Sequence, residues 1–140
     1  MLKGEFEYTL DDKGRVVIPP RFRRQIGDRF VVTRGFDGCV VLYPESEWAG
    51  VEDKLRGEPL ANRQFVRYLL GSAVEVETDR QGRFVLPPPL REHAGIQRDV
   101  VVVGLINKLE IWSRERWQQY LKQTVQDESR LIEGMKELNL

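Results

Sequence analysis

The sequence predicts a mainly β protein with short helices, of the α+β class, built from two copies of one unit around a shared core. Three observations lead to this prediction. One phrase occurs twice, as DDKGRVVIPPRFR at 11–23 and as DRQGRFVLPPPLR at 79–91. Short stretches of alternating apolar and polar residues surround each phrase and end at turn residues, as is typical of strands. The segments between and after the two copies have helical spacing instead.

The two copies align when the sequence is shifted by 68 residues. The matched positions of the phrase are Asp11 with Asp79, Gly14 with Gly82, Arg15 with Arg83, Pro19 with Pro87, Pro20 with Pro88, Arg23 with Arg91 and Gly27 with Gly95. After a slip of two residues, 30–44 corresponds to 100–113. The repeat therefore predicts one domain at 5–47, a helical linker at 48–75, a second domain at 76–119 and a C-terminal helix at 120–140.

Each copy predicts the same order of elements. An alternating strand, EFEYTL or AVEVET, leads into a turn whose glycine can take a positive φ. A second short strand, RVVI or RFVL, stops at the prolines, which suit the first turn of a helix. We expect that short helix to end at Gly27 or Gly95. Two more strands, joined at FDG or INK, and a helix capped by Ser46 or Ser113 complete the unit.

Two further segments have helical spacing. In the linker, Leu60, Phe65, Leu69 and Leu70 lie on or near one helix face. The stretch 117–138 carries an apolar stripe that needs a partner surface, in its own chain or in a neighbouring subunit. The stripe consists of Tyr120, Leu121, Val125, Leu131, Ile132, Met135 and Leu138. Because one unit of this size is too small to bury a good core, we expect the two copies to interleave their strands.

A formal net charge of zero hides an uneven distribution of basic residues. The segment 13–34 has one acidic residue, whereas the matching segment 81–103 has three basic and two acidic residues. The basic residues of the first segment are Lys13, Arg15, Arg21, Arg23, Arg24, Arg29 and Arg34. We interpret this segment as a phosphate-contacting surface of the first copy. The alternative is an ordinary solvated face.

Asp11 and Arg15 flank the turn of the first copy, as Asp79 and Arg83 do in the second. Two interpretations are open. The pair can simply bridge its turn, which is worth only about 0–1 kcal/mol when exposed, and we expect this of the second copy. In the first copy the carboxylate can instead orient the guanidinium toward a nucleic acid. Arginine suits this task because its planar fork contacts phosphate or a guanine edge with two donors, and a two-stranded ribbon fits a major groove.

Several classes of function find no support in the sequence. His93 is the only histidine, so a histidine-based metal site or catalytic triad cannot be built. Cys39 is the only cysteine, which favours a small core residue in a reducing compartment. We expect Trp48, Trp112 and Trp117 to pack rather than to stack on bases. We therefore expect no enzyme, no cofactor and no metal.

The longest apolar run, VVVVGLI at 100–106, is too short to span a bilayer and predicts a buried strand. The N-terminal residues also lack the apolar run of a signal peptide. We therefore expect a cytoplasmic protein without a membrane partner.

The doubled phrase, with its paired glycines, prolines and arginines, resembles the two signature segments of the MraZ family of bacterial regulators, encoded at the head of the division and cell-wall gene cluster. The resemblance extends from about Glu5 to about Tyr120. It implies two tandem SpoVT/AbrB-like swapped-hairpin units that form an intrachain pseudo-dimer barrel. It also implies a ring-shaped homo-oligomer that binds double-stranded DNA, at repeated boxes upstream of its own operon, as a repressor in the nucleoid.

The resemblance and the charge pattern together predict a set of DNA-binding residues. The family's motif matches Asp11, Gly14 and Arg15, and Arg15 matches its key DNA-contacting arginine. The full expected set is Arg15, Lys13, Asp11, Gly14, Arg21, Arg23, Arg24 and Arg83. The second copy departs from the first at Arg80 and Gln81, so whether it contacts DNA stays open. An antitoxin-like or scaffold module that mainly binds a protein is the alternative function.

Overall fold

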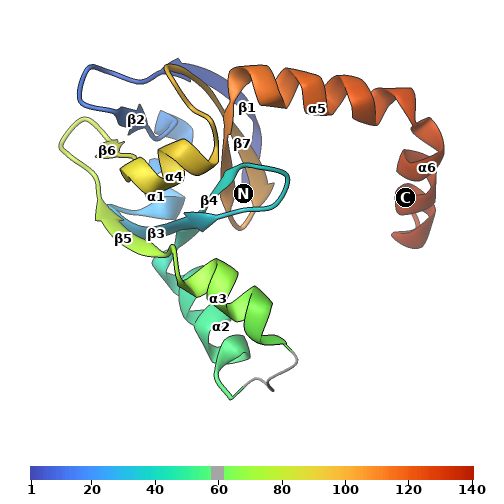
Figure 1. Ribbon diagram of the computed structural model, residues 1–140, viewed down its shortest axis with the longest axis horizontal. Coiled ribbons are helices and arrows are strands. Elements are labelled where there is room, and N and C mark those ends of the chain that lie inside the picture. Colours follow the sequence, from blue (N-terminus) through green and yellow to red (C-terminus); the bar gives the residue numbers. More distant parts are fainter. Residues whose placement is uncertain (58–61) are drawn as a thin grey trace.

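The computed structural model describes residues 1–57 and 62–140. The strands are β1 (Leu2–Thr9), β2 (Arg15–Val17), β3 (Arg29–Arg34), β4 (Val40–Pro44), β5 (Val74–Glu77), β6 (Arg83–Val85), β7 (Asp99–Ile106) and β8 (Leu109–Ser113). The helices are the 3₁₀-helix η1 (Pro20–Phe22), α1 (Arg23–Ile26), α2 (Glu45–Leu55), α3 (Arg63–Leu70), α4 (Pro88–His93), α5 (Arg114–Gln126) and α6 (Glu128–Glu137). The fold is mixed α+β, as the sequence predicts (Figure 1).

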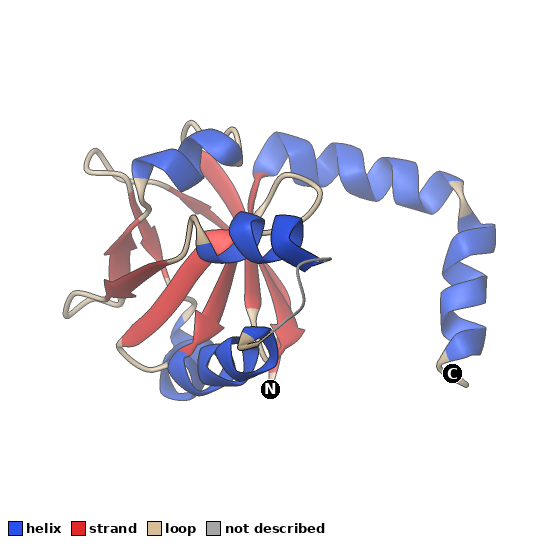
Figure 2. Ribbon diagram, turned by 60° about the horizontal axis from the view of Figure 1, so that its bottom comes forward, coloured by secondary structure: helices blue, strands red, loops and turns tan. Residues whose placement is uncertain are grey.

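The strands form a six-stranded sheet and a separate two-stranded ribbon. The sheet has the order β1-β7-β8-β4-β3-β5, and the ribbon pairs β2 with β6. Strands β1, β3 and β4 of the first copy correspond to β5, β7 and β8 of the second. Replacing each strand by its counterpart gives the same sheet order read backwards. The two copies are therefore related by an approximate twofold axis. Figure 2 shows the ribbon projecting beyond one end of the sheet.

Strand pairing interleaves the two copies, as the repeat predicts. All eight residues of β1, in the first copy, pair antiparallel with β7 of the second. In the other half of the sheet, β5 of the second copy pairs antiparallel with β3 of the first. Because strands cross between the copies, the domain boundaries at 47 and 76 stay predictions from the repeat.

One apolar core takes side chains from both copies. Phe30 of β3 meets Phe84 of β6 edge to face, with 5.1 Å between the ring centroids. Each of these two residues is only 1% exposed. The T-shaped arrangement adds to the hydrophobic burial that both rings gain. The main core is therefore shared by the two copies.

Alternate residues of the sheet face a second layer, because successive side chains of a strand point to opposite faces. Trp48 of α2 packs there with Val31 and with Leu69 of α3. Cys39 packs in a separate cluster with Trp112, near the start of α5. The expectation that Cys39 is a buried packing residue is confirmed. Leu60, which the linker prediction includes, lies outside the described residues.

The helices that close the two copies begin differently. Ser113 caps α5 as predicted, because its side chain accepts a hydrogen bond from the Arg116 amide. Ser46 does not cap α2, which begins one residue earlier, at Glu45, with Pro44 in the capping position. Ser46 therefore lies inside the first turn of the helix rather than at its cap.

The C-terminal segment is helical, as predicted, but it is broken into α5 and α6 at Asp127. The carboxylate of Asp127 accepts a hydrogen bond from Ser129 Oγ at 2.6 Å and lies 3.5 Å from Arg130 Nε. These local contacts favour a new helix start over continuation. Helix α5 leaves the body of the molecule and α6 turns away from its axis, so the two form a bent arm (Figure 1).

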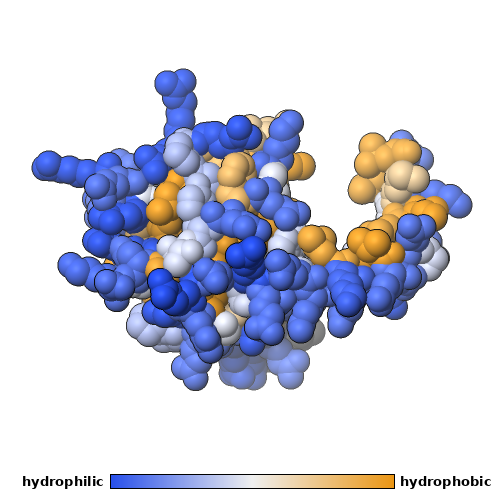
Figure 3. Space-filling model, turned by 90° about the horizontal axis from the view of Figure 1, so that it is seen from above, coloured by the Kyte–Doolittle hydropathy of each residue, from blue (hydrophilic) through white to orange (hydrophobic). Residues whose placement is uncertain are grey.

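The arm, residues 114–140, exposes its apolar stripe. Neither α5 nor α6 has a buried residue. Figure 3 shows hydrophobic side chains along the inner side of the arm, facing the hollow between arm and body. The exposed apolar residues of the arm are Tyr120, Val125, Leu131, Ile132, Met135, Leu138 and Leu140. In the described parts of the chain, no helix has the length and apolar content that a membrane span requires.

Candidate nucleic-acid interface

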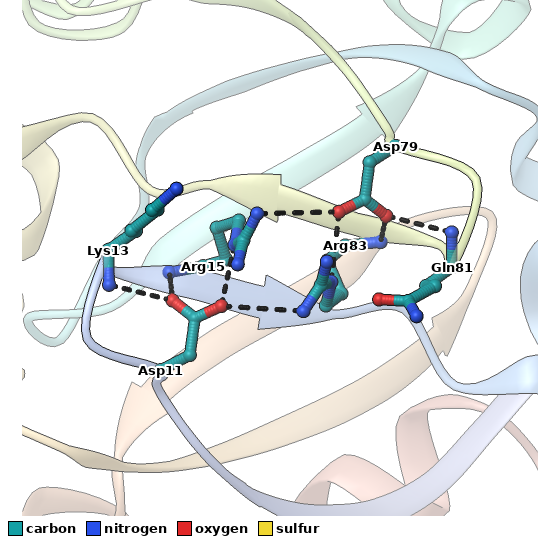
Figure 4. Close-up of polar contacts among 6 residues, drawn as sticks. All are labelled: Asp11, Lys13, Arg15, Asp79, Gln81 and Arg83. Carbon is teal, nitrogen blue, oxygen red and sulfur yellow. Dashed lines mark hydrogen bonds and ion pairs between the residues drawn. The ribbon is translucent and has the colours of Figure 1, made fainter.

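The two turns of the repeated phrase lie at opposite ends of the β2–β6 ribbon (Figure 4). Each turn is bonded to the strand of the other copy. The amide of Ile18 donates to the carbonyl of Gly82 at 2.8 Å, and the amide of Leu86 donates to the carbonyl of Gly14 at 3.0 Å. The ribbon is therefore built jointly by both copies and follows the same approximate twofold axis as the sheet.

Asp11 holds the first turn through its side chain. Its Oδ1 atom accepts hydrogen bonds from the amides of Lys13, at 3.0 Å, and of Arg15, at 2.9 Å. The turn also needs a residue with positive φ, and Gly14 supplies it with a φ of 72°. Aspartate and glycine at this spacing thus specify the turn locally.

The second copy repeats this turn. Oδ1 of Asp79 accepts from the amides of Gln81 and Arg83, both at 2.9 Å. Gly82 has a φ of 75°. The substitution of Gln81 for lysine leaves the geometry unchanged, because only the main-chain amide of that residue is used.

The remaining carboxylate oxygens bind arginines from both copies. Arg15 Nε lies 2.5 Å from Asp11 Oδ2, and Arg15 Nη1 lies 3.8 Å from Asp79 Oδ2. Arg83 mirrors this, with Nε 2.9 Å from Asp79 Oδ2 and Nη1 3.7 Å from Asp11 Oδ2. We call these four residues the Asp–Arg cluster. Figure 4 shows it as a closed ring of alternating charge over the middle of the ribbon.

The carboxylates of the cluster stay ionised at neutral pH. The hydrogen bond from the Arg15 amide is the main cause that lowers the pKa of Asp11 to about 2, against a smaller opposing effect of desolvation. The pKa of Asp79 is also lowered, first of all by the hydrogen bond from the Arg83 amide. The four formal charges therefore cancel.

The two arginines of the cluster have equivalent surroundings. Their side chains are 25% exposed for Arg15 and 29% exposed for Arg83. Among the described residues, each uses Nε and Nη1 on carboxylates and has no such partner at Nη2. Because a guanidinium carries five N–H donors in a rigid fork, donors remain on both residues for a phosphate or a base edge.

Three of the other predicted residues are exposed, in the first turn or in the short helices that follow β2. Lys13 is in the first turn, Arg21 is in η1 and Arg24 is in α1. Arg21 lies over the Phe6 ring, 5.5 Å from its centroid. Long cationic side chains on a short helix and a turn can reach phosphates beside the ribbon.

Arg23 has a different setting, because it links the two copies. It is only partly exposed, its Nε donates to the Ile18 carbonyl at 3.2 Å, and its guanidinium fills the space beside Gly82, where a Cβ would collide with it. Arg91 mirrors Arg23 and lies beside Gly14. Sequence reasoning missed this role of Arg91, although the alignment of Arg23 with Arg91 in the repeat was the signal for it.

The charge difference between the two turns is smaller than the segment 13–34 suggests. Arg29 pairs with Glu77 at 3.5 Å, and Arg34 Nε donates to the Tyr68 carbonyl of α3 at 2.9 Å, so both serve other contacts. When the turns and short helices of the two copies are aligned position by position, three cations and one anion of the first copy have no like-charged counterpart in the second. The second copy has one cation and one anion without such a counterpart in the first. These residues are Asp12, Lys13, Arg21 and Arg24 in the first copy and Arg80 and Glu92 in the second.

Within residues 1–57 and 62–140, no group of three or more histidine, cysteine, aspartate or glutamate side chains is arranged to hold a metal ion. His93 lies on α4, and its ring centroid is 6.3 Å from that of Tyr68.

Comparison with known proteins links both copies to one family. The family model described as "MraZ protein, putative antitoxin-like" matches residues 1–65 and 69–134. Proteins called "Transcriptional regulator MraZ" from Thermoanaerobacter pseudethanolicus and Moorella thermoacetica are each 46% identical over 143 aligned positions, which cover 100% of both chains. A protein of the same name from Natranaerobius thermophilus is 48% identical over 126 positions, or 88% of each chain.

Proposed function

Since the chain belongs to the MraZ family, we propose that it is a transcription regulator that binds double-stranded DNA through the β2–β6 ribbon. The observation that carries this proposal is the pair of arginines over the ribbon, each with donors left for a ligand. The names of its relatives support regulation of transcription. We expect the ribbon to enter a major groove, because two antiparallel strands fit its width.

The expected DNA-binding residues divide into two groups. We expect Arg15 and Arg83 to contact base edges, with Asp11 and Gly14 shaping the turn that presents Arg15. We expect Lys13, Arg21 and Arg24 to contact phosphates, which fix the register of a protein on the duplex without carrying sequence information. Arg23 supports the site from between the two copies.

The target that we propose is a set of repeated short boxes upstream of the chain's own operon, with repression as the outcome. One short ribbon makes few contacts and binds weakly. A ring of several subunits on several boxes gains avidity, because each later contact forms within an existing complex. We further propose that the interleaved copies amount to the swapped-hairpin barrel of the AbrB-like class.

A titration against duplex DNA tests the regulator. A fluorescent duplex with the chain's own upstream region is compared with a scrambled duplex at 50 and at 200 mM salt. We expect a clear preference for the upstream duplex. Affinity should also fall steeply with salt, by about 10³-fold or more if six or more phosphates are contacted. Weak binding to both duplexes at both salt concentrations would contradict the proposal.

A module that mainly binds a protein is the second candidate, because the arm exposes an apolar stripe. An exposed apolar surface of this kind marks a contact with another protein. We assign that contact to a neighbouring subunit of the ring rather than to a different protein. Without DNA binding in the titration above, the protein-binding module would become the better interpretation.

Charging the stripe should break the ring. We expect the double substitution Leu131→Glu and Ile132→Glu to reduce the mass of the assembly, because it places two carboxylates in an apolar contact. Both residues are exposed in the single chain, so circular dichroism should stay unchanged. Gln119→Glu and Gln126→Glu add the same charge to α5, on the face away from the stripe, and should leave the mass unchanged. Light scattering measures the mass, and an unchanged mass of the first variant would rule out this contact.

A further inference from the structure

The ion pairs of the Asp–Arg cluster cross from one copy to the other. We propose that Asp79 of the second copy is a positioning residue for Arg15 of the first, and so helps to determine which DNA sequence the chain prefers. Asp11 has the reciprocal position beside Arg83. This inference rests on the proposed DNA-binding function and adds to it a cause of selectivity that lies outside the first copy.

The main chain fixes the carboxylate of Asp79. Its Oδ1 atom is held by two amides of its own turn, those of Gln81 and Arg83. Its Oδ2 atom therefore has a set position, 3.8 Å from Arg15 Nη1. A mobile carboxylate would move with the Arg15 side chain, whereas the fixed carboxylate of Asp79 can hold the guanidinium in position.

Contacts at two positions restrict the orientation of a guanidinium plane, whereas a single contact leaves it free to rotate. With Asp11 alone, the Arg15 side chain could turn about its Nε contact, since a free arginine has many rotamers. The ion pair with Asp79, at 3.8 Å, reduces that freedom because it attracts the Nη1 end of the fork to one side. A guanine edge is read by two parallel donors, so readout depends on the plane of the fork. Attraction to phosphate depends on charge and needs no such alignment.

Selective and non-selective binding should therefore respond differently to the loss of the Asp79 charge. Asp79→Asn keeps an oxygen for the turn amides and removes the charge that faces Arg15 at 3.8 Å. It also replaces the oxygen that accepts from Arg83 Nε at 2.9 Å, so the variant tests the position of both arginines of the cluster. Preference for the upstream duplex should fall by about tenfold or more, the discrimination expected of one bidentate base contact. Affinity for the scrambled duplex should stay equal or rise, because a negative charge has been removed from the interface.

The experiment titrates the full chain, as wild type and as Asp79→Asn, against upstream and scrambled duplexes at one salt concentration. The matched control is Glu92→Gln, which removes one negative charge from the exposed surface of α4, outside the cluster. The control should raise both affinities without changing their ratio. An unchanged ratio for Asp79→Asn would overturn the inference.

Unfolding of the variant is detected separately, by circular dichroism. If Asp79→Asn fails to fold by circular dichroism, Asp79→Ser takes its place, because serine also offers an oxygen to the turn amides. If neither variant folds, Asp79 serves stability and the inference is wrong. If the wild type itself shows no preference between the duplexes, the proposed function fails, which is a different result.

Discussion

Replacing Arg15 with alanine should remove the preference of the chain for its own upstream DNA, and replacing Arg83 with alanine should do nearly the same. The charge pattern of the sequence singles out the first copy, but both arginines have the same partners and nearly the same exposure. We expect each variant to lose about 10- to 100-fold in affinity for the upstream duplex, the discrimination of one bidentate base contact. Each loss also leaves the cluster with a net negative charge that repels phosphate.

Fluorescence anisotropy with the upstream and scrambled duplexes measures both variants. Arg56→Ala is the matched control, because it removes the same charge from a 77% exposed side chain that lies outside both the ribbon and the arm. The control should keep the preference of the wild type. If only Arg15→Ala loses the preference for the upstream duplex, the additional basic residues of the first copy determine DNA binding. The similar surroundings of the two arginines then do not determine it. If neither variant loses it, the ribbon is not the DNA-binding surface.

Replacing Phe84 with alanine should destabilise both copies together. The Phe84 ring comes from β6 of the second copy and packs on Phe30 of the first, deep in the shared core. Truncation of a buried phenylalanine costs about 3–5 kcal/mol. This is a large part of the free energy of unfolding of a typical domain, about 5–15 kcal/mol. We therefore expect a partly or fully unfolded chain rather than the loss of one copy.

Urea unfolding, followed by far-ultraviolet circular dichroism and by tryptophan fluorescence, measures this effect. The fluorescence signal sums Trp48, which packs on the first copy, with Trp112 and Trp117 of the second, so it reports on both copies. Circular dichroism and fluorescence should show one common unfolding transition, at a lower urea concentration than in the wild type. Val85→Ala, in the same strand but 53% exposed, should change stability by about 0.5 kcal/mol or less. Two separate transitions would show that the copies fold independently.

Much of the fold could be predicted because its local signals are strong. Alternation predicts the strands, and the repeat predicts that each element occurs twice. The wrong predictions concern helix ends, where neighbouring residues can each begin or end a helix and the sequence pattern does not show which one does. Pro44 displaces Ser46 from the start of α2, and Asp127 ends one helix and begins another. The position of the arm relative to the body has no local signal at all.

The sequence by itself determined the two turns, since Asp11 and Asp79 bind amides only two and four residues further along the chain. Contacts at such short separation follow from residue type and spacing. Only the tertiary structure decided that Arg15 also faces Asp79 and that Arg23 lies beside Gly82. These pairs meet because β2 and β6 are brought together by the shared core. That packing depends on many weak contacts between distant residues, so no single motif in the sequence encodes it.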